Sequence, residues 1–545
     1  MKKFHLSSSR MMLSLGAAAL LAPLFAHADT TFKGVPSKGT LVGSGTFALK
    51  SLSHNALPRF TAKEMPNFTP RRRGNTAATL GAVPQVDSSS VQKSASAVLA
   101  NFNGISDLSS AIANGGILVE PPDQGLCVGN FLGHRRVFEI VNIAIAEYTP
   151  AGTQLGIQDV NSFFNEPEPA FNGELVSDPR CIFDKSTDTF FFTAVATNLT
   201  VPSATTLESH VDIVVVNGTT GTFVEYKFDT TDLSNSNGDC PCLDDQPKVG
   251  IDNNAIYIGA DEFSLTSNLY NGAELLVISK PQMVSAAGSV NAAYFTNLIL
   301  AGIPVLDLMP AISVSSTNTE YLENSFPFDA VGNPVFSTNV IGLWRVTDDE
   351  DVTNGGLPNL SARLVKTETY AIPVNAATTP AGNFLNTNDD RMGQLEFIDG
   401  DLWSSVETSV NIKGTIGEVV GAAWFKIDAA TSVVDNQGYV ATKGQYLIYP
   451  TILHTSSGLT TINFTITNPT LNPSAAFVRL SSSKTIEIEA TGVSPYDIPF
   501  PNRWGDYSWA TLDPDGVHIW MGNEYIPSLS DQAPIANWGT EIFEQ

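Results

Sequence analysis

The sequence predicts an all-β protein, a seven-bladed β-propeller of four-stranded antiparallel blades. Three observations favour this fold: a short acidic phrase recurs along the chain, each copy opens a run of strand-like segments, and helical periodicity is nearly absent. The comparable starting points, about 55 to 80 residues apart, are Asp123, Asp178, Asp245, Pro310, Asp390, Tyr446 and Asp506. Four-stranded sheets that stack radially bury both faces of each sheet and leave only short edges exposed. Two β-sandwiches are the alternative, but a sandwich does not need an acidic phrase at the start of each unit.

Three of these units can be divided into strands from sequence alone, because short β-rich segments alternate with Asn, Asp, Gly and Pro. One unit has candidate strands at 181–183, 190–196, 211–216 and 222–228. The next has them at 248–251, 255–260, 273–278 and 293–298, with Asp252-Asn253-Asn254 suited to a tight hairpin. A third has them at 392–397, 402–406, 422–427 and 432–440. Each unit is longer than a usual blade repeat, which predicts long loops.

Residues 1–28 have the features of a secretory signal peptide. Basic residues precede an apolar run at 11–25, and Ala26-His27-Ala28 offers small residues at the −3 and −1 positions. We expect the mature chain to start near Asp29 and to be secreted, whether to the periplasm, the cell surface or the medium. No later segment approaches the roughly 20 apolar residues of a membrane-spanning helix, so no membrane span is expected.

Residues 29–115 differ in composition from the rest of the chain, with serine runs, the triplet Arg71-Arg72-Arg73 and few aromatic residues. We expect a poorly structured N-terminal extension or linker there, and the propeller at 116–545. The ring should close where a last strand near 538–543 pairs beside a strand from 116–120.

The composition excludes one class of partner. The net charge is −26 for the full chain, and it becomes about −29 when the three cations of the leader are removed. Such a chain repels nucleic acid, so no nucleic-acid partner is expected. With 43% hydrophobic residues the chain can fill a sizeable core, and we expect a monomer.

The four cysteines, Cys127, Cys181, Cys240 and Cys242, predict disulfides, because export leads to an oxidising compartment. Three pairings are open. A Cys127–Cys181 bond would join the first strands of two adjacent repeats, whereas Cys240 and Cys242 would close a small ring or bond elsewhere. A redox or metal role is the alternative, although C-x-C without a second Cys or His cluster does not match a zinc site.

Several phrases together resemble a family of uncharacterised secreted bacterial β-propeller-like proteins. The phrases are Pro121-Pro122-Asp123-Gln124-Gly125 with Val128-Gly129, Asp178-Pro179-Arg180, Cys240-Pro241-Cys242 with Asp245-Gln246-Pro247, and Arg503-Trp504-Gly505-Asp506-Tyr507. The resemblance covers about residues 101–543. It implies export and a propeller-like fold, and it brings no reaction and no catalytic residues.

Acidic turns that open the blades should converge at one mouth of the central channel. The candidate catalytic carboxylates are Asp178, Asp245, Asp390, Asp506 and Glu524, and the candidate ligand-binding residues are Asp123, Arg180, Arg391, Arg503 and Tyr507. Such a mouth could bind a polar ligand, hold Ca²⁺ through oxygen ligands, or place an acid/base pair. The structural alternative is that these residues cap turns and join blade to blade.

Signatures of common hydrolases and nucleotide-binding proteins are missing: the sequence has no G-x-S-x-G, H-E-x-x-H or G-x-x-x-x-G-K motif. We therefore expect a secreted binding or scaffold protein that recognises an extracellular polymer, a glycan or a surface protein, through the channel mouth and loops. The alternative is an extracellular glycoside hydrolase or polysaccharide lyase that uses paired carboxylates. Whether the protein is an enzyme stays open at this point, and structural Ca²⁺ in the channel is a third hypothesis.

Overall fold

The computed structural model describes residues 29–50, 58–65, 82–94, 98–166, 174–198, 208–231, 240–265, 267, 269–329, 334–380, 382–481, 484–496 and 503–545. The predicted signal peptide and the Arg71–Arg73 triplet lie outside them. Among the described residues, no helix is long and apolar enough to cross a membrane.

The chain is mostly β, and consecutive strands pair as antiparallel sheets. The first sheet contains β8 (Gly125–Phe131), β9 (His134–Val141), β10 (Ala144–Tyr148) and β11 (Gln154–Asp159). The second contains β12 (Glu174–Asp184), β13 (Thr189–Asn198), β14 (Ser209–Asn217) and β15 (Thr222–Asp229). The third contains β16 (Cys242–Ile251), β17 (Ala255–Ser264), β18 (Tyr270–Ser279) and β19 (Ser289–Phe295).

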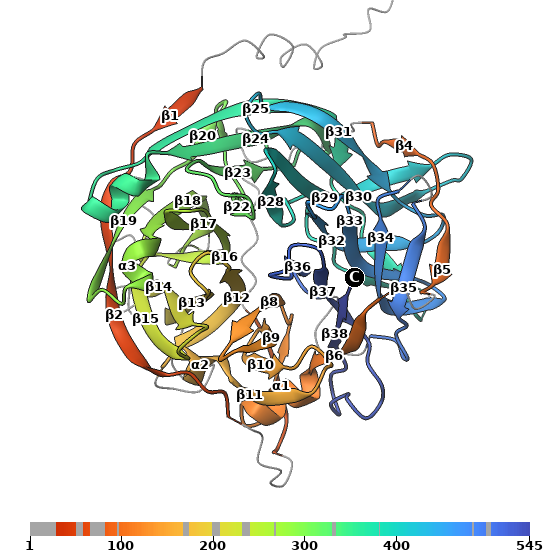
Figure 1. Cartoon of the computed structure of the whole chain (residues 1–545). Coiled ribbons are helices and arrows are strands. Elements are labelled where there is room, and N and C mark those ends of the chain that lie inside the picture. The colour runs from red at the N-terminus through yellow and green to blue at the C-terminus, as the bar shows by residue number, and fades with distance from the viewer. Residues whose placement is uncertain are drawn as a thin grey trace, which may run out of the picture.

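The same pattern continues to the C-terminus. The next strands are β22 (Met309–Ser313), β23 (Glu320–Asn324), β24 (Ser337–Thr347) and β25 (Asn359–Ala371). After them come β28 (Leu395–Ile398), β29 (Asp401–Ile412), β30 (Glu418–Asp428) and β31 (Val433–Val440), and then β32 (Tyr446–His454), β33 (Thr460–Asn468), β34 (Leu471–Arg479) and β35 (Ile486–Ala490). The last are β36 (Trp509–Leu512), β37 (Ile519–Tyr525) and β38 (Gly539–Glu544). Figure 1 shows the sheets arranged around a common centre, with β8, β12, β16, β22, β28, β32 and β36 innermost.

The prediction of a poorly structured N-terminal extension is wrong for its described part, which supplies strands to the outer edges of the sheets. Strand β2 (Val35–Thr46) pairs antiparallel with both β15 and β19 and so joins two sheets, while β1 (Thr30–Phe32) pairs with β25. Strands β4 (Gln85–Val86) and β5 (Val91–Lys93) pair parallel with β29 and β35. The outermost strands of the sheets present unpaired N–H and C=O groups, and the described strands of the extension satisfy them. We call this segment, which follows the rim in Figure 1, the outer belt.

Closure also differs from the prediction. Strand β38 pairs antiparallel with β6 (Ala100–Ser106), not with a strand at 116–120. Strand β7 (Ile117–Glu120) instead pairs parallel with β3 (Thr61–Glu64). The helix α1 (Asp107–Ala113), which begins at a Ser106 capping box, lies between β6 and β7. The strand that completes the C-terminal sheet therefore lies on the N-terminal side of this helix.

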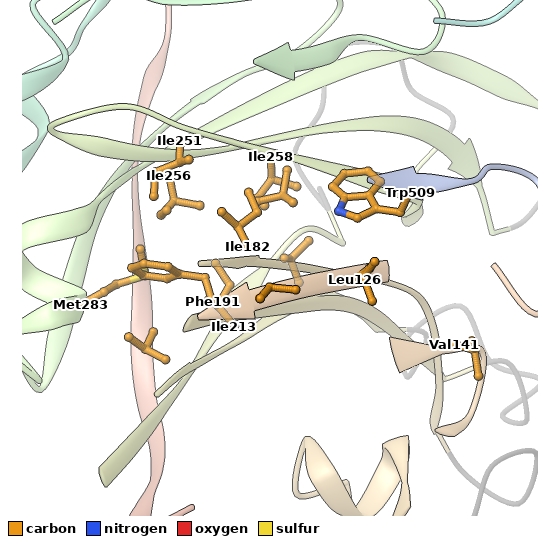
Figure 2. Packing of buried hydrophobic residues seen from close by; sticks show 14 of the residues in the cluster. Leu126, Val141, Ile182, Phe191, Ile213, Ile251, Ile256, Ile258, Met283 and Trp509 are labelled. Atoms are coloured by element: carbon orange, nitrogen blue, oxygen red, sulfur yellow. The ribbon is translucent and has the colours of Figure 1, made fainter. Parts of the chain in front are cut away.

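Apolar side chains from facing sheets fill the spaces between them. Figure 2 shows one such cluster, in which Ile182, Phe191 and Ile213 lie opposite Ile251 and Ile258. The fully buried tryptophans are Trp344, Trp504, Trp509, Trp520 and Trp538. Two disulfides add covalent links: Cys127–Cys181 joins β8 to β12, and Cys240 bonds to Cys242.

Candidate functional site

The central channel has two ends that differ chemically. We call the end where long connections lead into the innermost strands the loop side, and the end where tight turns follow those strands the turn side. The candidates predicted from the sequence lie on the loop side, because the repeated acidic phrases directly precede or open the innermost strands.

Asp506 is the centre of a hydrogen-bond network on the loop side. Its carboxylate accepts from the side-chain amides of Asn388 and Gln246 and from Arg503, whose Nη2 lies 3.2 Å from Oδ2. Its backbone N–H donates to Asp123 Oδ1 at 2.6 Å. These partners come from widely separated parts of the chain, so one carboxylate ties several sheets together across the channel.

Asn142 extends the network to the second sheet. Its Nδ2 donates to Asp123 Oδ2 at 2.7 Å, and its Oδ1 accepts from the Asp178 backbone N–H at 2.9 Å. The Arg180 guanidinium stacks over the Tyr507 ring at 3.0 Å from the centroid, and the Tyr507 hydroxyl donates to the carbonyl of Pro179. A cation over an aromatic face is stabilised most where water is excluded, and Arg180 is buried.

Backbone geometry explains why acidic and amide residues recur at these positions. Asp123, Asp178, Gln246, Asp307 and Asn388 all have positive φ, between 41° and 60°. Asn and Asp tolerate this left-handed region better than other non-glycine residues, and their short side chains bond to nearby backbone. Much of the repeated phrase therefore serves the turn that leads the chain into each innermost strand.

The remaining predicted residues differ in burial and in whether they line the loop-side cavity. Glu524 is buried and accepts the Gly505 N–H at 2.8 Å, whereas Asp245 is only partly buried. Asp390 is fully buried and does not line the channel; its neighbour Asp389 does, and it pairs with Arg391 at 2.9 Å.

The structure also shows residues that were not predicted from the sequence. They are Gln246, Asn388, Lys248, Asp307 and Tyr449, all of which line the loop-side cavity. Lys248 lies 2.7 Å from Asp307 and 3.2 Å from Asp261, and Arg391 donates to Gln246. One sequence signal could have found two of them: Gln246 and Tyr449 each precede a proline at an interruption of β-pairing, as Asp178 does.

Electrostatics and space both limit what the loop side can do. Burial, followed by the charges of Asp506 and Asp178, raises the pKa of Asp123 well above its usual value, and burial followed by Asp506 raises the pKa of Asp178. Burial also raises the pKa of Glu524. The loop-side cavity, which is lined by residues such as Arg180, Gln246 and Asp506, is about 40 Å³, enough for only a few water molecules. The arrangement is well suited to joining sheets, and the cavity that the described residues form here has little room for a polymer.

A much larger cavity, of about 810 Å³, lies on the turn side. Its walls are the ends of the innermost strands and the turns after them, including 181–186, 251–253, 312–316 and 511–517. Polar side chains among its lining residues include Asp184, Lys185, Asn253, Ser457 and Asp515, and they lie beside apolar ones such as Ile251 and Val314. Turns such as Asp252-Asn253-Asn254 were expected only as hairpin devices, so this cavity was not predicted from the sequence.

Charged groups in the turn-side cavity differ in their protonation. Lys280 Nζ lies 3.1 Å from Asp184 Oδ2, and it also donates to the Asp252 carbonyl. Burial alone would raise the pKa of Asp184, but Lys280 and two hydroxyl groups lower it below its usual value. Burial and then Asp349 raise the pKa of Asp252 to about 8, and burial raises that of Glu396. The cavity thus presents the ionised carboxylate of Asp184 beside Asp252, whose pKa of about 8 favours the protonated form near neutral pH.

Three groups of side chains in the described ranges are close enough to share a cation. They are Cys240, Cys242 and Glu262; Glu166, Glu174 and His210; and Asp401, Asp428 and Asp435. In the first group the two cysteines are bonded to each other, so neither offers a thiolate. None of these groups contains the loop-side aspartates for which Ca²⁺ was considered.

No family model and no curated protein matches the chain. Solved structures of β-propeller proteins are similar to it. Europium-containing methanol dehydrogenase has 9% identity and a TM-score of 0.35 over 77% of this chain and 80% of that one. Trypanosoma rangeli sialidase in complex with sialic acid has 9% identity and a TM-score of 0.33, over 68% of this chain and 54% of that one. The α-L-arabinofuranosidase Arb93A from Fusarium graminearum has 8% identity and a TM-score of 0.31, over 82% and 97%. Similarities at this level carry no argument about function.

Proposed function

We propose that the protein is an exported seven-bladed β-propeller that binds an extracellular polymer at its turn-side cavity. Seven blades follow from the pairing pattern if each innermost strand starts one blade and β6 completes the last. The observation that carries the binding proposal is the contrast between the two cavities that the described residues form: about 810 Å³ on the turn side against about 40 Å³ on the loop side. Ligand sites typically have volumes of about 300–1,000 Å³.

The chemistry of the rim favours a polyhydroxylated ligand such as a glycan. Carboxyl groups, hydroxyl groups and amides are all present among the lining residues, and Lys185 and Asn253 are exposed there. Sugar hydroxyls both donate and accept hydrogen bonds, so they can satisfy each of these group types. A chain with a strong negative charge disfavours polyanions, so a neutral or basic glycan fits best.

A glycoside hydrolase is the second candidate, supported by one specific observation. Asp252, whose pKa is raised to about 8, and Asp184, whose pKa is lowered, line the same cavity, as an acid and an ionised carboxylate would in such an enzyme. However, Asp252 Oδ1 already accepts the backbone N–H groups of Asn254 and Ala255 at 2.8 and 2.9 Å. Because this carboxyl group is committed to its own turn, we favour binding over hydrolysis.

The test is a binding screen of the mature chain against polysaccharides and glycan arrays, repeated with the double variant Lys185→Ala, Asn253→Ala. We expect the variant to lose at least tenfold in affinity for any polymer that binds. Lys443→Ala is the matched control, because it removes an exposed lysine that does not line the cavity. Equal binding by wild type and double variant would refute the turn-side site. Release of reducing ends from a bound polymer would favour the hydrolase instead.

A further inference from the structure

A cluster of ionisable groups lies between the first and second sheets, apart from both ends of the channel. It contains four carboxyl groups and two basic groups, which are Glu166, Glu174, Asp212, Glu225, His210 and Lys227. Glu166 follows α2 (Val160–Phe163), and the others lie on β12, β14 and β15. Asp212 is fully buried, Glu225 is 1% exposed, and His210 is 8% exposed.

Strand register explains how the cluster forms. Asp212 is directly opposite Lys227 on β15 and opposite Ala194 on β13, and His210 is opposite Ala196. Residues two apart on a strand share a face, so His210, Asp212, Glu225 and Lys227 point to the same side of the sheet. Both alanines are fully buried and end at Cβ, which leaves space above the sheet for these longer polar side chains.

His210 is oriented as metal-binding histidines are. Its Nδ1 lies 2.8 Å from Asp212 Oδ1, and its Nε2 lies 3.4 Å from Glu174 Oε2. A metal-ligating histidine typically donates its second ring N–H to a carboxylate, which fixes the tautomer and turns the other nitrogen toward the ion. One ligand atom each from His210, Glu174 and Glu166 lies within 4.8 Å of the other two.

Glu225 provides an independent indication that the cluster is incomplete. Neither of its carboxylate oxygens has a hydrogen-bond partner within the described part of the chain, although the residue is almost entirely buried. It interacts electrostatically with Asp212, Lys227, Glu166 and His210, so it faces the cluster. A buried carboxyl group without a donor is costly, and a bound cation would remove that cost.

We propose that Glu166, Glu174 and His210 form a binding site for a divalent transition-metal ion such as Zn²⁺. One imidazole and two carboxylates form the mixed N/O ligand set of zinc sites, whereas Ca²⁺ prefers oxygen ligands alone. Asp212 orients His210, and Glu225 adds negative charge beside the ion. A ring nitrogen that ligates a metal ion carries no proton, so binding requires the neutral imidazole of His210. Lys227, which contacts Glu166, is the internal cation that the metal must compete with. The ion would join the segment after α2 to the second sheet, and this role is separate from polymer binding.

The experiment titrates ZnCl₂ into the EDTA-dialysed mature chain, followed by calorimetry and thermal unfolding. We expect one saturable site per chain, a rise in Tm with Zn²⁺, and at least tenfold weaker binding in both His210→Gln and Glu174→Gln. His518→Gln is the matched control, because His518 also pairs with an aspartate but lies on the surface, and it should bind Zn²⁺ like wild type.

Three outcomes would overturn the proposal: no saturable binding, full binding by both cluster variants, or loss of binding in His518→Gln. The first two would mean that the cluster is only an internal ion-pair network. X-ray absorption of the Zn²⁺-loaded wild type does not depend on any variant folding. An imidazole with oxygen ligands supports the site, and a shell containing sulfur or oxygen alone refutes it.

Discussion

Asp506→Asn tests whether the loop-side network is structural. The substitution preserves the shape of the side chain, so the packing around it stays the same. It removes the charge opposite Arg503 and replaces one acceptor oxygen with an amino group that faces the donors Gln246 or Asn388. The network would then hold opposed donors and an arginine without its nearest carboxylate.

The expected loss follows from competing contributions. Both side chains of the Arg503–Asp506 pair are at most 10% exposed, and breaking a buried pair costs about 3–5 kcal/mol. A buried donor left unsatisfied costs about 1–3 kcal/mol more. Part of this is offset, because Asp506 also repels Asp123 and Asp178, whose pKa values it helps to raise. We expect a net loss of about 3 kcal/mol in the free energy of unfolding.

Urea unfolding monitored by tryptophan fluorescence measures this loss. Asp87→Asn is the control, because the Asp87–Lys413 pair is exposed and such pairs contribute less than about 1 kcal/mol. If Asp506→Asn unfolds at the same urea concentration as Asp87→Asn, the network does not hold the sheets together. Polymer binding should be unchanged in Asp506→Asn, since the proposed site lies at the other end of the channel.

Three further predictions concern other parts of the fold. Gly39→Val should lower the Tm markedly, since a Cβ at Gly39 would lie 2.3 Å from a phenyl ring on β15. Gly288→Ala is the control and should not lower the Tm, because the space around Gly288 is open. Equal melting of the two variants would contradict the pairing of β2 with β15. Burial raises the pKa of Glu323 to about 7, so the folded state binds its proton more tightly than the unfolded chain, and stability should fall as pH rises from about 4.5 to 8 by about 3 kcal/mol. In Glu323→Gln the fall of the Tm between about pH 4.5 and 8 should be smaller than in wild type. An equal fall in both proteins would refute the assignment of this pH dependence to Glu323. Replacing Cys127 and Cys181 together by serine should lower the free energy of unfolding by about 4 kcal/mol, because the disulfide closes a loop of 54 residues in the unfolded chain. An unchanged urea midpoint would show that the disulfide does not stabilise the fold.

Local patterns in the sequence predicted much of the sheet structure. The hairpin at Asp252-Asn253-Asn254 is present, because Asp252 accepts the N–H groups of Asn254 and Ala255 within its own turn. The strands expected at 190–196 and 211–216 lie within β13 and β14. Alternating side chains and turn residues are local properties, so a sequence can show them without knowledge of the partner strands.

The outer belt could not be predicted in the same way, because its partners are distant in the chain. Strand β2 pairs with β15 and β19. Likewise, β38 pairs with β6 and not with β7, although β7 is closer to β38 in the sequence. One signal was available: glycines recur in β2, and Gly39, Gly43 and Gly45 each lie against a side chain of β15. A strand laid over large side chains needs such gaps, whereas a flexible linker would use glycine without regard to spacing.

The convergence of distant acidic turns was predictable, but the identity of each residue was not. Asp123 and Asp506 meet as the repeat suggested, while Asp389 and not Asp390 faces the channel. Asp389 and Asp390 lie outside the strands, directly after Asn388 with its left-handed φ, and only Asp390 is buried, so an error of one residue exchanges a channel residue for a core residue.

Because the stabilising network and the proposed binding site lie at opposite ends of the channel, substitutions can test stability and binding separately. A closed network needs groups that satisfy one another, and Asp506, Asp123 and Arg503 do so. A binding surface instead needs exposed polar groups such as Lys185 and Asn253. Asp506→Asn should therefore lower stability and spare polymer binding, and Lys185→Ala with Asn253→Ala should do the reverse. If instead Asp506→Asn weakened binding at unchanged stability and Lys185→Ala with Asn253→Ala did not, the ligand would occupy the loop side, and the acidic phrases would be the recognition elements.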